Sequence, residues 1–275
     1  MRTEIMGRYV EVAGHRLYLD TGGDPAGQPM ILIHTAGQNT LQWRFVLPYF
    51  AERGYFVVAP DLPGHGKSLL RDFKPLDSVH DFAETVWQLK QRLELKRPVV
   101  IGCSIGGDIT LDLAVHHGSE MGAAVVCEAA ARTPTFPPRL VEMGLEDSGV
   151  PSYGDQGALG GLSACGIRAL PERVAEIVWT RRMGDPKVYY HDLKAWITHD
   201  IRTRLREISC PLAVVWGSED YFVPYNLVKE TVEAVPNAQW IVLEGIGHYP
   251  HIETPAFNGV VEKFLNSLAK DRRKE

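Results

Sequence analysis

Short apolar runs alternate with amphipathic stretches along most of the chain. Continuously apolar runs of this length are typical of strands buried on both faces of a parallel sheet. They fall at residues 30–33, 55–59, 99–101, 123–127, 212–216 and 239–243. Apolar residues at helical spacing separate them, at residues 40–53, 78–94, 105–117, 224–235 and 255–270. The alternation predicts an α/β fold with a mostly parallel sheet flanked by helices on both faces.

Two segments depart from this alternation. Residues 8–14 and 15–22 alternate apolar and polar positions around the turn Ala13-Gly14, which predicts a β-hairpin. Residues 133–206 show no strand pattern, but they contain proline-rich and glycine-rich stretches followed by helical patterns at residues 171–182 and 187–198. We therefore expect residues 1–132 and 207–275 to form one core, interrupted after the sixth strand by an insertion at the carboxyl edge of the sheet.

Composition narrows the class of protein. The 275 residues are 45% hydrophobic and 23% charged, as in an ordinary globular protein. A net charge of −5 argues against nucleic-acid binding. No apolar stretch approaches the roughly 20 residues of a membrane span, and residues 1–10 lack the apolar core of a secretory signal. The four cysteines lack Cys-x-x-Cys spacing, so we expect reduced thiols in a cytoplasmic protein. The sequence is compatible with a homo-oligomer.

The segment Gly102-Cys103-Ser104-Ile105-Gly106 has the spacing of a Gly-x-Ser-x-Gly nucleophile elbow. It lies between a strand run and a helical pattern, so a sharp turn would expose the Ser104 hydroxyl beside a helix N-terminus, where negative charge is favoured. A serine hydroxyl is a weak nucleophile near neutral pH and needs an adjacent base. The alternative interpretation is that Ser104 only caps the helix.

Candidates for the base and its partner follow two later strand runs. Asp220 comes shortly after residues 212–216, and His248 comes shortly after residues 239–243. Because reactive groups collect at the carboxyl ends of parallel strands, we expect Ser104, Asp220 and His248 to converge. His248 would accept the serine proton, and Asp220 would hold the imidazole in the required tautomer.

The chain resembles the α/β-hydrolase superfamily over nearly its full length. The resemblance rests on the elbow and on the strings His34-Thr35-Ala36-Gly37, Asp61-Leu62-Pro63-Gly64-His65-Gly66-Lys67-Ser68, Gly217-Ser218-Glu219-Asp220 and Gly247-His248-Tyr249-Pro250-His251-Ile252-Glu253. It implies the α/β-hydrolase fold with the order Ser104, Asp220, His248 along the chain. It also implies that residues 133–206 form a helical cap and that the reaction needs no cofactor.

The resemblance further implies an oxyanion hole built from the backbone N–H groups of Ala36 and Ile105. Thr35 stands where the family usually carries glycine. We interpret the Thr35 hydroxyl as a cap of its own loop rather than as part of the site, because threonine side chains readily bond nearby backbone groups.

A second acid follows another strand run. Glu128 comes directly after residues 123–127, a position from which some α/β-hydrolases, including the zearalenone-type lactonases, take their acid. The alternative role for Glu128 is that of a hydrogen-bonded residue at the rim beneath the cap. We favour Asp220, because it matches the usual strand–acid placement.

The remaining polar motifs are interpreted as structural. His34 and His65 belong to loop motifs of the family, and the turn that follows Asp61 suggests that its carboxylate bonds backbone groups. His116, His117 and His191 are not arranged with a third ligand, so no metal site is predicted. Serine at the nucleophile position argues against haloalkane-dehalogenase and epoxide-hydrolase chemistry.

Together these observations predict a serine hydrolase whose partner is a small to mid-sized, largely apolar carboxylic ester or lactone. Two alternatives stay open, a carbon–carbon bond hydrolase of ring-cleavage products and a ligand receptor that retains the hydrolase pocket. Trp179, Tyr189, Tyr190 and Trp196 lie in the helical patterns of the insertion, where they either pack against the core or face the cleft. Trp179 is our first choice for a substrate-binding residue over Ser104.

Overall fold

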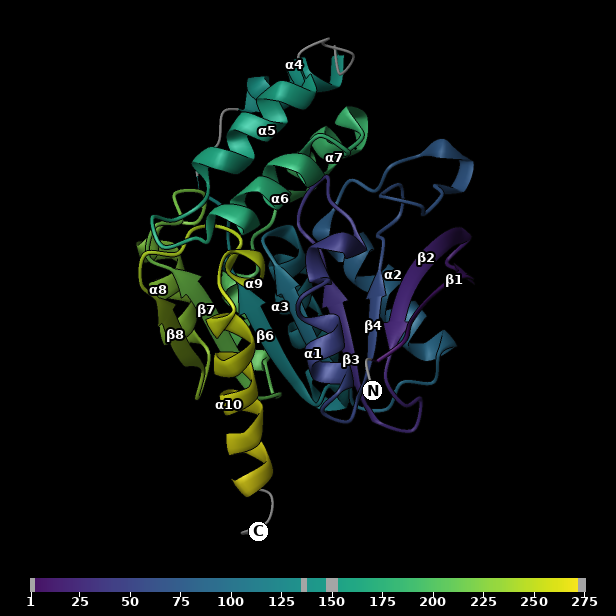
Figure 1. Ribbon diagram of the computed structural model, residues 1–275, viewed down its shortest axis with the longest axis vertical. Coiled ribbons are helices and arrows are strands. Elements are labelled where there is room, and N and C mark those ends of the chain that lie inside the picture. Colours follow the sequence, from purple (N-terminus) through teal and green to yellow (C-terminus); the bar gives the residue numbers. More distant parts are fainter. Residues whose placement is uncertain (1–2, 135–137, 147–152, 272–275) are drawn as a thin grey trace.

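One sheet of eight strands organises the molecule (Figure 1). The structure is a computed structural model that describes residues 3–134, 138–146 and 153–271. The strand order is β1-β2-β4-β3-β5-β6-β7-β8. The strands are β1 (Ile5–Val12), β2 (His15–Gly22), β3 (Gln28–Ile33), β4 (Tyr55–Pro60), β5 (Val99–Cys103), β6 (Ala123–Cys127), β7 (Leu212–Gly217) and β8 (Gln239–Leu243). From β4 to β8 every neighbouring pair is parallel, which confirms the predicted sheet.

The first two strands form the predicted hairpin. β1 pairs with β2 in antiparallel register, and Val12 lies opposite His15. Ala13 and Gly14 make the turn with φ values of 53° and 79°. Two successive positive φ values match the right-handed twist of the flanking strands, and this explains the small residue and the glycine at the turn.

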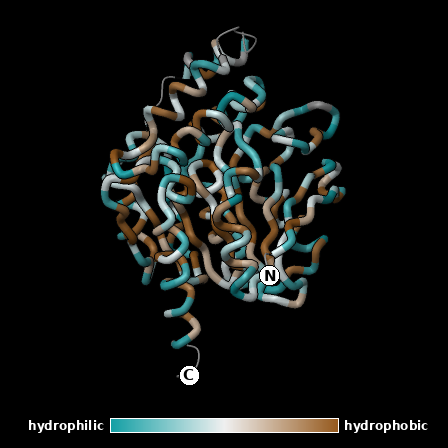
Figure 2. The backbone as a smooth tube through the Cα atoms, viewed as in Figure 1, coloured by the Kyte–Doolittle hydropathy of each residue, from teal (hydrophilic) through white to brown (hydrophobic). Residues whose placement is uncertain are grey.

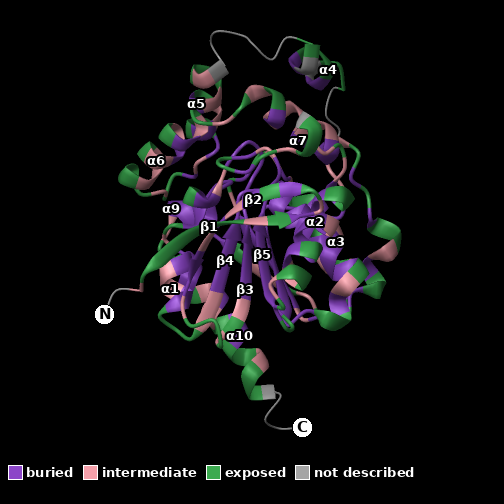
Figure 3. Cartoon of the chain, turned by 90° about the vertical axis from the view of Figure 1, so that its right-hand side faces the viewer, coloured by how far each residue is buried: buried purple, intermediate pink, exposed green. Residues whose placement is uncertain are grey.

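Helices cover both faces of the sheet. α2 (Val79–Arg92), α3 (Ile105–His117) and α8 (Tyr225–Ala234) share one apolar cluster with the sheet. α1 (Leu47–Ala51) and α10 (Ala256–Asp271) share the other. Figure 3 shows the buried strands between α1 on one side and α2 and α3 on the other. Hydrophobic positions gather along the central strands in Figure 2, as expected for strands covered on both faces.

Three helical segments differ from the sequence prediction. The stretch at residues 40–53 is not one helix but η1 (Thr40–Trp43) followed by α1, with Pro48 in the first turn of α1, where proline is tolerated. α4 (Pro138–Glu146) and α5 (Tyr153–Ser163) were not predicted, because proline and glycine are poor helix formers. Shorter elements complete the described chain, namely η2 (Arg71–Phe73), η3 (Gly118–Glu120), η4 (Arg202–Glu207) and α9 (Pro250–Glu253).

The segment between β6 and β7 lies beyond the carboxyl ends of the parallel strands (Figure 1). It contains α4, α5, α6 (Pro171–Arg181) and α7 (Pro186–Ile197). We call residues 133–206 the cap segment; within it, residues 135–137 and 147–152 lie outside the described residues. Across the described part of the chain, no helix has the length and apolar character needed to cross a membrane. The four cysteines are free thiols, as predicted.

Candidate active site

Ser104 occupies a strained turn between β5 and α3. Its backbone φ of 57° and ψ of −126° lie in a region that non-glycine residues rarely adopt. The backbone is crowded on both sides of the turn. A Cβ at Gly102 would lie 1.9 Å from the Gly106 carbonyl oxygen, and a Cβ at Gly106 would lie 2.4 Å from the Ile33 carbonyl oxygen. Glycine is therefore required at both positions by close backbone approach.

His248 and Asp220 meet at the ends of β8 and β7. His248 Nδ1 lies 2.9 Å from Asp220 Oδ2, and both side chains are buried. Asp220 Oδ1 accepts a second hydrogen bond, 2.8 Å long, from the Phe222 N–H. The carboxylate therefore accepts a hydrogen bond from the Nδ1–H of His248, which leaves Nε2 as the basic nitrogen.

Glu128 lies next to Asp220 and also holds the end of β7. Its Oε1 accepts a hydrogen bond of 2.7 Å from the Gly217 N–H at the end of β7. The side chain is fully buried. Burial, and then the neighbouring Asp220 carboxylate, raise the pKa of Glu128 well above its ordinary value. In this geometry Asp220, and not Glu128, is the acid that contacts His248.

A second carboxylate, which the sequence reasoning did not single out, holds the loop around His248. Glu253 Oε2 accepts hydrogen bonds from the N–H of Gly247 at 2.8 Å and of Gly166 at 2.9 Å. Its Oε1 accepts another, at 2.9 Å, from the N–H of Tyr249. Both neighbours of His248 are thus fixed by one buried side chain. An acidic residue five positions after a loop histidine was the available signal.

The two expected oxyanion donors border the same pocket as Ser104. Ile105 opens α3, where the first N–H groups of a helix have no partner within the helix. Ala36 lies in the loop after β3, and both residues line the pocket. Whether their N–H groups stabilise an oxyanion stays a prediction.

The interpretation of Thr35 as a loop cap is wrong. Its hydroxyl has no hydrogen-bond partner among the described residues, and the residue lines the pocket beside Ser104. Gln42 takes the capping role, because its Oε1 accepts a 3.0 Å hydrogen bond from the Thr35 N–H. Gln42 lies seven positions after Thr35, and η1 brings its side-chain amide back to the Thr35 N–H.

The pocket between core and cap segment has an empty volume of about 440 Å³, including space open to solvent. The core lines it with Ser104 and His248 among other residues, and the cap segment adds Arg181, Tyr189, Leu193 and Trp196. The walls are thus largely aromatic and aliphatic, with one guanidinium among them.

Trp179 is not in this pocket, contrary to the prediction. Its side chain is 55% exposed. On α6 the face turned inward carries Ile177, Thr180 and Arg181, and Trp179 lies on the opposite side of the same helix. Trp196 on α7 is the tryptophan that lines the pocket and is 8% exposed.

The loop residues that were predicted to be structural make the expected backbone contacts. Asp61 accepts hydrogen bonds from the N–H of Thr40 at 2.7 Å and of Lys67 at 2.8 Å, so the backbone-bonding role is confirmed. His34 Nδ1 donates to the Thr35 carbonyl at 2.8 Å, and its Nε2 accepts from the Leu62 N–H at 3.0 Å. Burial lowers the pKa of His34 well below its ordinary value, in keeping with a neutral ring.

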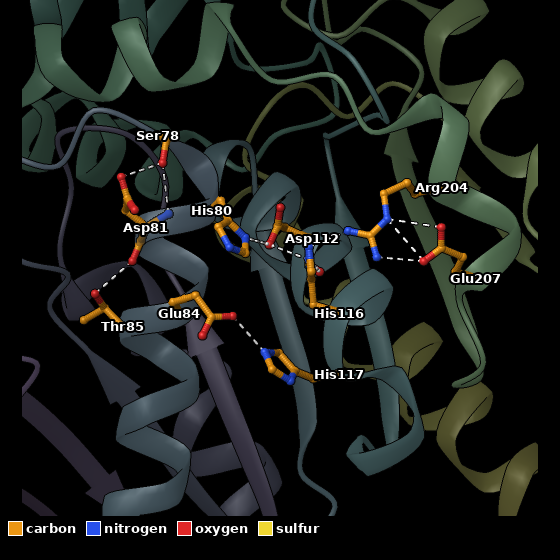
Figure 4. A network of polar contacts seen from close by, with 10 residues as sticks. All are labelled: Ser78, His80, Asp81, Glu84, Thr85, Asp112, His116, His117, Arg204 and Glu207. Carbon is orange, nitrogen blue, oxygen red and sulfur yellow. Dashed lines mark hydrogen bonds and ion pairs between the residues drawn. The ribbon is translucent and has the colours of Figure 1, made fainter.

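A cluster of possible metal ligands lies between α2 and α3 (Figure 4). The sequence analysis found no third ligand near His116, but the fold brings His80 from α2 and Asp112 to it, with their ligand atoms within 4.8 Å of one another. In this structure His80 Nδ1 and His116 Nδ1 contact Asp112 Oδ1 at 2.9 and 3.1 Å, and the Arg204 guanidinium contacts the other nitrogen of His116. Asp112 Oδ1 and both ring nitrogens of His116 therefore have protein partners in this arrangement, and one of these partners is the cationic Arg204.

The chain is similar to known proteins over most of its length. The chain is 23% identical over 257 residues to a pimeloyl-[acyl-carrier protein] methyl ester esterase of Vibrio atlanticus, covering 88% of this chain and 95% of that protein. It is 27% identical over 282 residues to a 2-hydroxymuconate semialdehyde hydrolase of a Pseudomonas species, covering 94% of each. The crystal structure of an enol-lactonase from Burkholderia xenovorans superposes with a TM-score of 0.84 at 22% identity, over 94% of this chain and 100% of that one. The family model for the alpha/beta hydrolase fold matches residues 28–255, and the chain belongs to this family of hydrolases.

Proposed function

We propose that this protein is a serine hydrolase that cleaves a small to mid-sized, largely apolar carboxylic ester or lactone. One observation carries the proposal. The 2.9 Å contact between His248 Nδ1 and Asp220 Oδ2 lies beside a pocket that both His248 and Ser104 line. A serine on a strained elbow, with an imidazole oriented by a buried carboxylate, is an arrangement suited to acyl transfer.

The reaction would use only groups of this chain and water. Ser104 Oγ attacks the substrate carbonyl and passes its proton to Nε2 of His248, while Asp220 stabilises the imidazolium. The N–H groups of Ala36 and Ile105 bind the oxyanion. His248 then protonates the leaving alcohol or enol, which leaves an acyl group on Ser104. A water molecule deprotonated by His248 attacks this acyl group, and His248 returns the proton to Ser104 Oγ as the acid departs.

The pocket walls support an apolar substrate of limited size. Tyr189, Leu193, Trp196 and Phe222 contribute aromatic and aliphatic surface around Ser104. Such walls bind by burying apolar area, and the few polar groups fix orientation.

Carbon–carbon bond hydrolysis of a ring-cleavage product is the second candidate, and Arg181 is the observation that favours it. Its guanidinium is part of the pocket lining. A guanidinium can pair with a carboxylate in bidentate geometry. The resemblance to 2-hydroxymuconate semialdehyde hydrolase points the same way, since muconate derivatives are carboxylates.

A substrate screen with a site-directed label tests the proposal. p-Nitrophenyl esters of increasing chain length, aromatic lactones and a dienone carboxylate should be compared at equal enzyme concentration, and a fluorophosphonate should label Ser104. Ser104→Ala should abolish labelling and reduce turnover by several orders of magnitude, because nucleophile loss has that effect in serine hydrolases.

Three results separate the alternatives. A preference for the dienone over every ester would favour carbon–carbon hydrolysis. Turnover slower than about once per hour, with product retained on the protein, would favour a receptor. Label on another serine, or full activity of Ser104→Ala, would contradict the serine mechanism itself.

A further inference from the structure

The cap segment is hydrogen-bonded to the loop that carries Ala36. The Ala36 carbonyl accepts a 3.2 Å hydrogen bond from Nη1 of Arg181, and the Gly37 N–H donates a 2.8 Å hydrogen bond to Oδ2 of Asp192. This C=O and this N–H belong to one peptide unit. The cap segment therefore holds both polar groups of the peptide that follows the proposed oxyanion donor.

The core holds the peptide unit that carries the Ala36 N–H itself. Its carbonyl, that of Thr35, accepts from the N–H of Gln38 at 3.2 Å and from Nδ1 of His34 at 2.8 Å, and the Thr35 N–H donates to Gln42. The Ala36 Cα joins this unit to the peptide that the cap segment holds. Because a peptide unit is planar, its carbonyl and its two Cα atoms set the direction of its N–H, so the core fixes one end of the unit and the cap segment fixes the other.

Close packing accompanies these hydrogen bonds. Gly37 has a φ of +65°, and a Cβ there would lie 2.9 Å from Cδ2 of Tyr189. A Cβ at Gly184, just before α7, would lie 2.5 Å from the Gly37 carbonyl oxygen. The start of α7 therefore rests directly on the loop, with no space for a methyl group between them.

Asp192 is anchored by a buried partner from the core. Its Oδ2 lies 2.7 Å from His65 Nε2, and both side chains are 1% exposed. His65 Nδ1 lies 3.1 Å from the Pro63 carbonyl. A carbonyl and a carboxylate are both acceptors, so each ring nitrogen must donate and His65 carries a proton on both. Its other titratable neighbours are Asp61 and the neutral His34, whose ring lies 4.8 Å from it.

We propose that Asp192 is a positioning residue for the oxyanion hole, so that docking of α7 onto the core completes the site. This inference rests on the proposed function and adds to it a coupling between cap and chemistry. Asp192 contacts no reacting atom; it acts by orienting the Ala36–Gly37 peptide. The cap segment then supplies catalytic geometry as well as pocket wall.

The test compares three variants in a p-nitrophenyl acetate assay, with the rate of fluorophosphonate labelling measured in parallel. Asp192→Ala should lower kcat by about 10- to 100-fold, less than the loss of a whole oxyanion donor, and change KM by less than about three-fold. Labelling of Ser104 should slow by a similar factor, because the phosphonyl oxygen enters the same hole. Asp192→Asn keeps an acceptor at the Oδ2 position and should recover kcat to within about five-fold of the wild type.

Asp185→Ala is the matched control. Asp185 caps the same helix by accepting from the N–H of Lys187 and Val188, and among the described residues its side chain makes no hydrogen bond with the loop of Ala36. Its loss should lower the melting temperature, as N-cap removal costs about 1 kcal/mol, and leave kcat within about two-fold. Equal kcat losses in Asp185→Ala and Asp192→Ala, or an unchanged kcat in Asp192→Ala, would overturn the proposal.

A fourth variant, Gly184→Ala, covers the case in which Asp192→Ala does not fold. It places a methyl group against the Gly37 carbonyl without touching Asp192, and it should lower kcat and the labelling rate by about five-fold or more. Unchanged values there would also overturn the proposal. The wild type is assayed before the variants. If it neither hydrolyses esters nor reacts with fluorophosphonate, the proposed function itself is refuted.

Discussion

The core and the cap segment build their halves of the pocket by different means. On the core side, the functional side chains stand at strand ends, and the backbone there is so crowded that a Cβ at Gly102 would lie 1.9 Å from the Gly106 carbonyl oxygen. On the cap side, Arg181, Tyr189 and Trp196 line the pocket because they lie on the faces of α6 and α7 that are turned toward the core. The positions of the catalytic groups therefore depend on backbone geometry at the strand ends. The shape of the pocket depends on how each cap helix is rotated about its axis.

Core and cap segment contact each other at several places, among them the hydrogen bonds from the Gly166 N–H to Glu253 and from the His248 N–H to the Ala164 carbonyl. Another contact lies at the pocket, where Asp192 and Arg181 of the cap segment hold a single peptide of the core and the His65–Asp192 contact is buried. The division between a core that carries the chemistry and a cap segment that shapes the pocket is therefore not strict, and the variants that follow measure how far it holds.

The largest effect is expected at the acid of the core. Asp220→Asn should lower kcat by about 10⁴-fold, because an amide favours the wrong tautomer of His248. Glu128→Gln should lower it by less than about ten-fold, since a glutamine retains the acceptor for the Gly217 N–H and replaces a carboxyl whose pKa is raised. Steady-state kinetics on one ester decides the matter; the reverse ranking would assign the acid role to Glu128.

A glycine pair compares backbone crowding in the two regions. Gly106→Ala in the core should cost about 3 kcal/mol or more, because the new methyl meets the carbonyl oxygens of Ile33 and His34 at 2.4 and 2.6 Å. Gly160→Ala in α5 has open space around it and should raise stability by about 0.5–1 kcal/mol through helix propensity. Urea unfolding of both variants measures the contrast, and equal losses would mean that the cap segment is packed as tightly as the core.

The same contrast explains what the sequence could predict. Ser104, Asp220 and His248 were found because each follows a strand run, and parallel strand ends converge whatever the side chains between them. Trp179 was misplaced because a helical pattern shows that residues repeat every turn but does not show which face of the helix meets the core until its neighbours are known. Only the packed fold shows that Ile177 and Arg181 face inward.

Contacts between distant segments were beyond sequence reasoning for a related reason. Glu253 is close in sequence to the loop that it holds, and its spacing was a usable signal. Asp192 bonds Gly37 across 155 positions, and nothing local to either residue marks the pair. The cluster of possible metal ligands was missed likewise, since it joins His80 of α2 to Asp112 of α3, which lies 32 positions further along the chain.

A tryptophan pair measures how much of the substrate preference lies in the cap segment. Trp196→Leu should raise KM about ten-fold for long-chain esters, because it removes aromatic area from the pocket wall. Trp179→Ala should leave KM and chain-length preference unchanged, as expected for a side chain that is 55% exposed. KM should be measured across the ester series. A shift in preference in Trp179→Ala alone would show that this residue enters the pocket when substrate binds.

The smallest effect concerns the charge that joins the two regions. Burial alone would lower the pKa of His65, but the Asp192 carboxylate outweighs it and raises that pKa above its ordinary value of 6.5. A group whose pKa is higher in the folded state contributes its full stability below its unfolded pKa and loses it as pH rises through the folded pKa. The stability advantage of the wild type over Asp192→Asn should therefore be greatest below about pH 6.5 and fall as pH rises through the raised pKa of His65. Urea unfolding at several pH values provides the measurement. An advantage that is constant over this range would mean that Asp192 holds the Gly37 peptide as a hydrogen-bond acceptor only, and that the charge of His65 contributes nothing to cap docking.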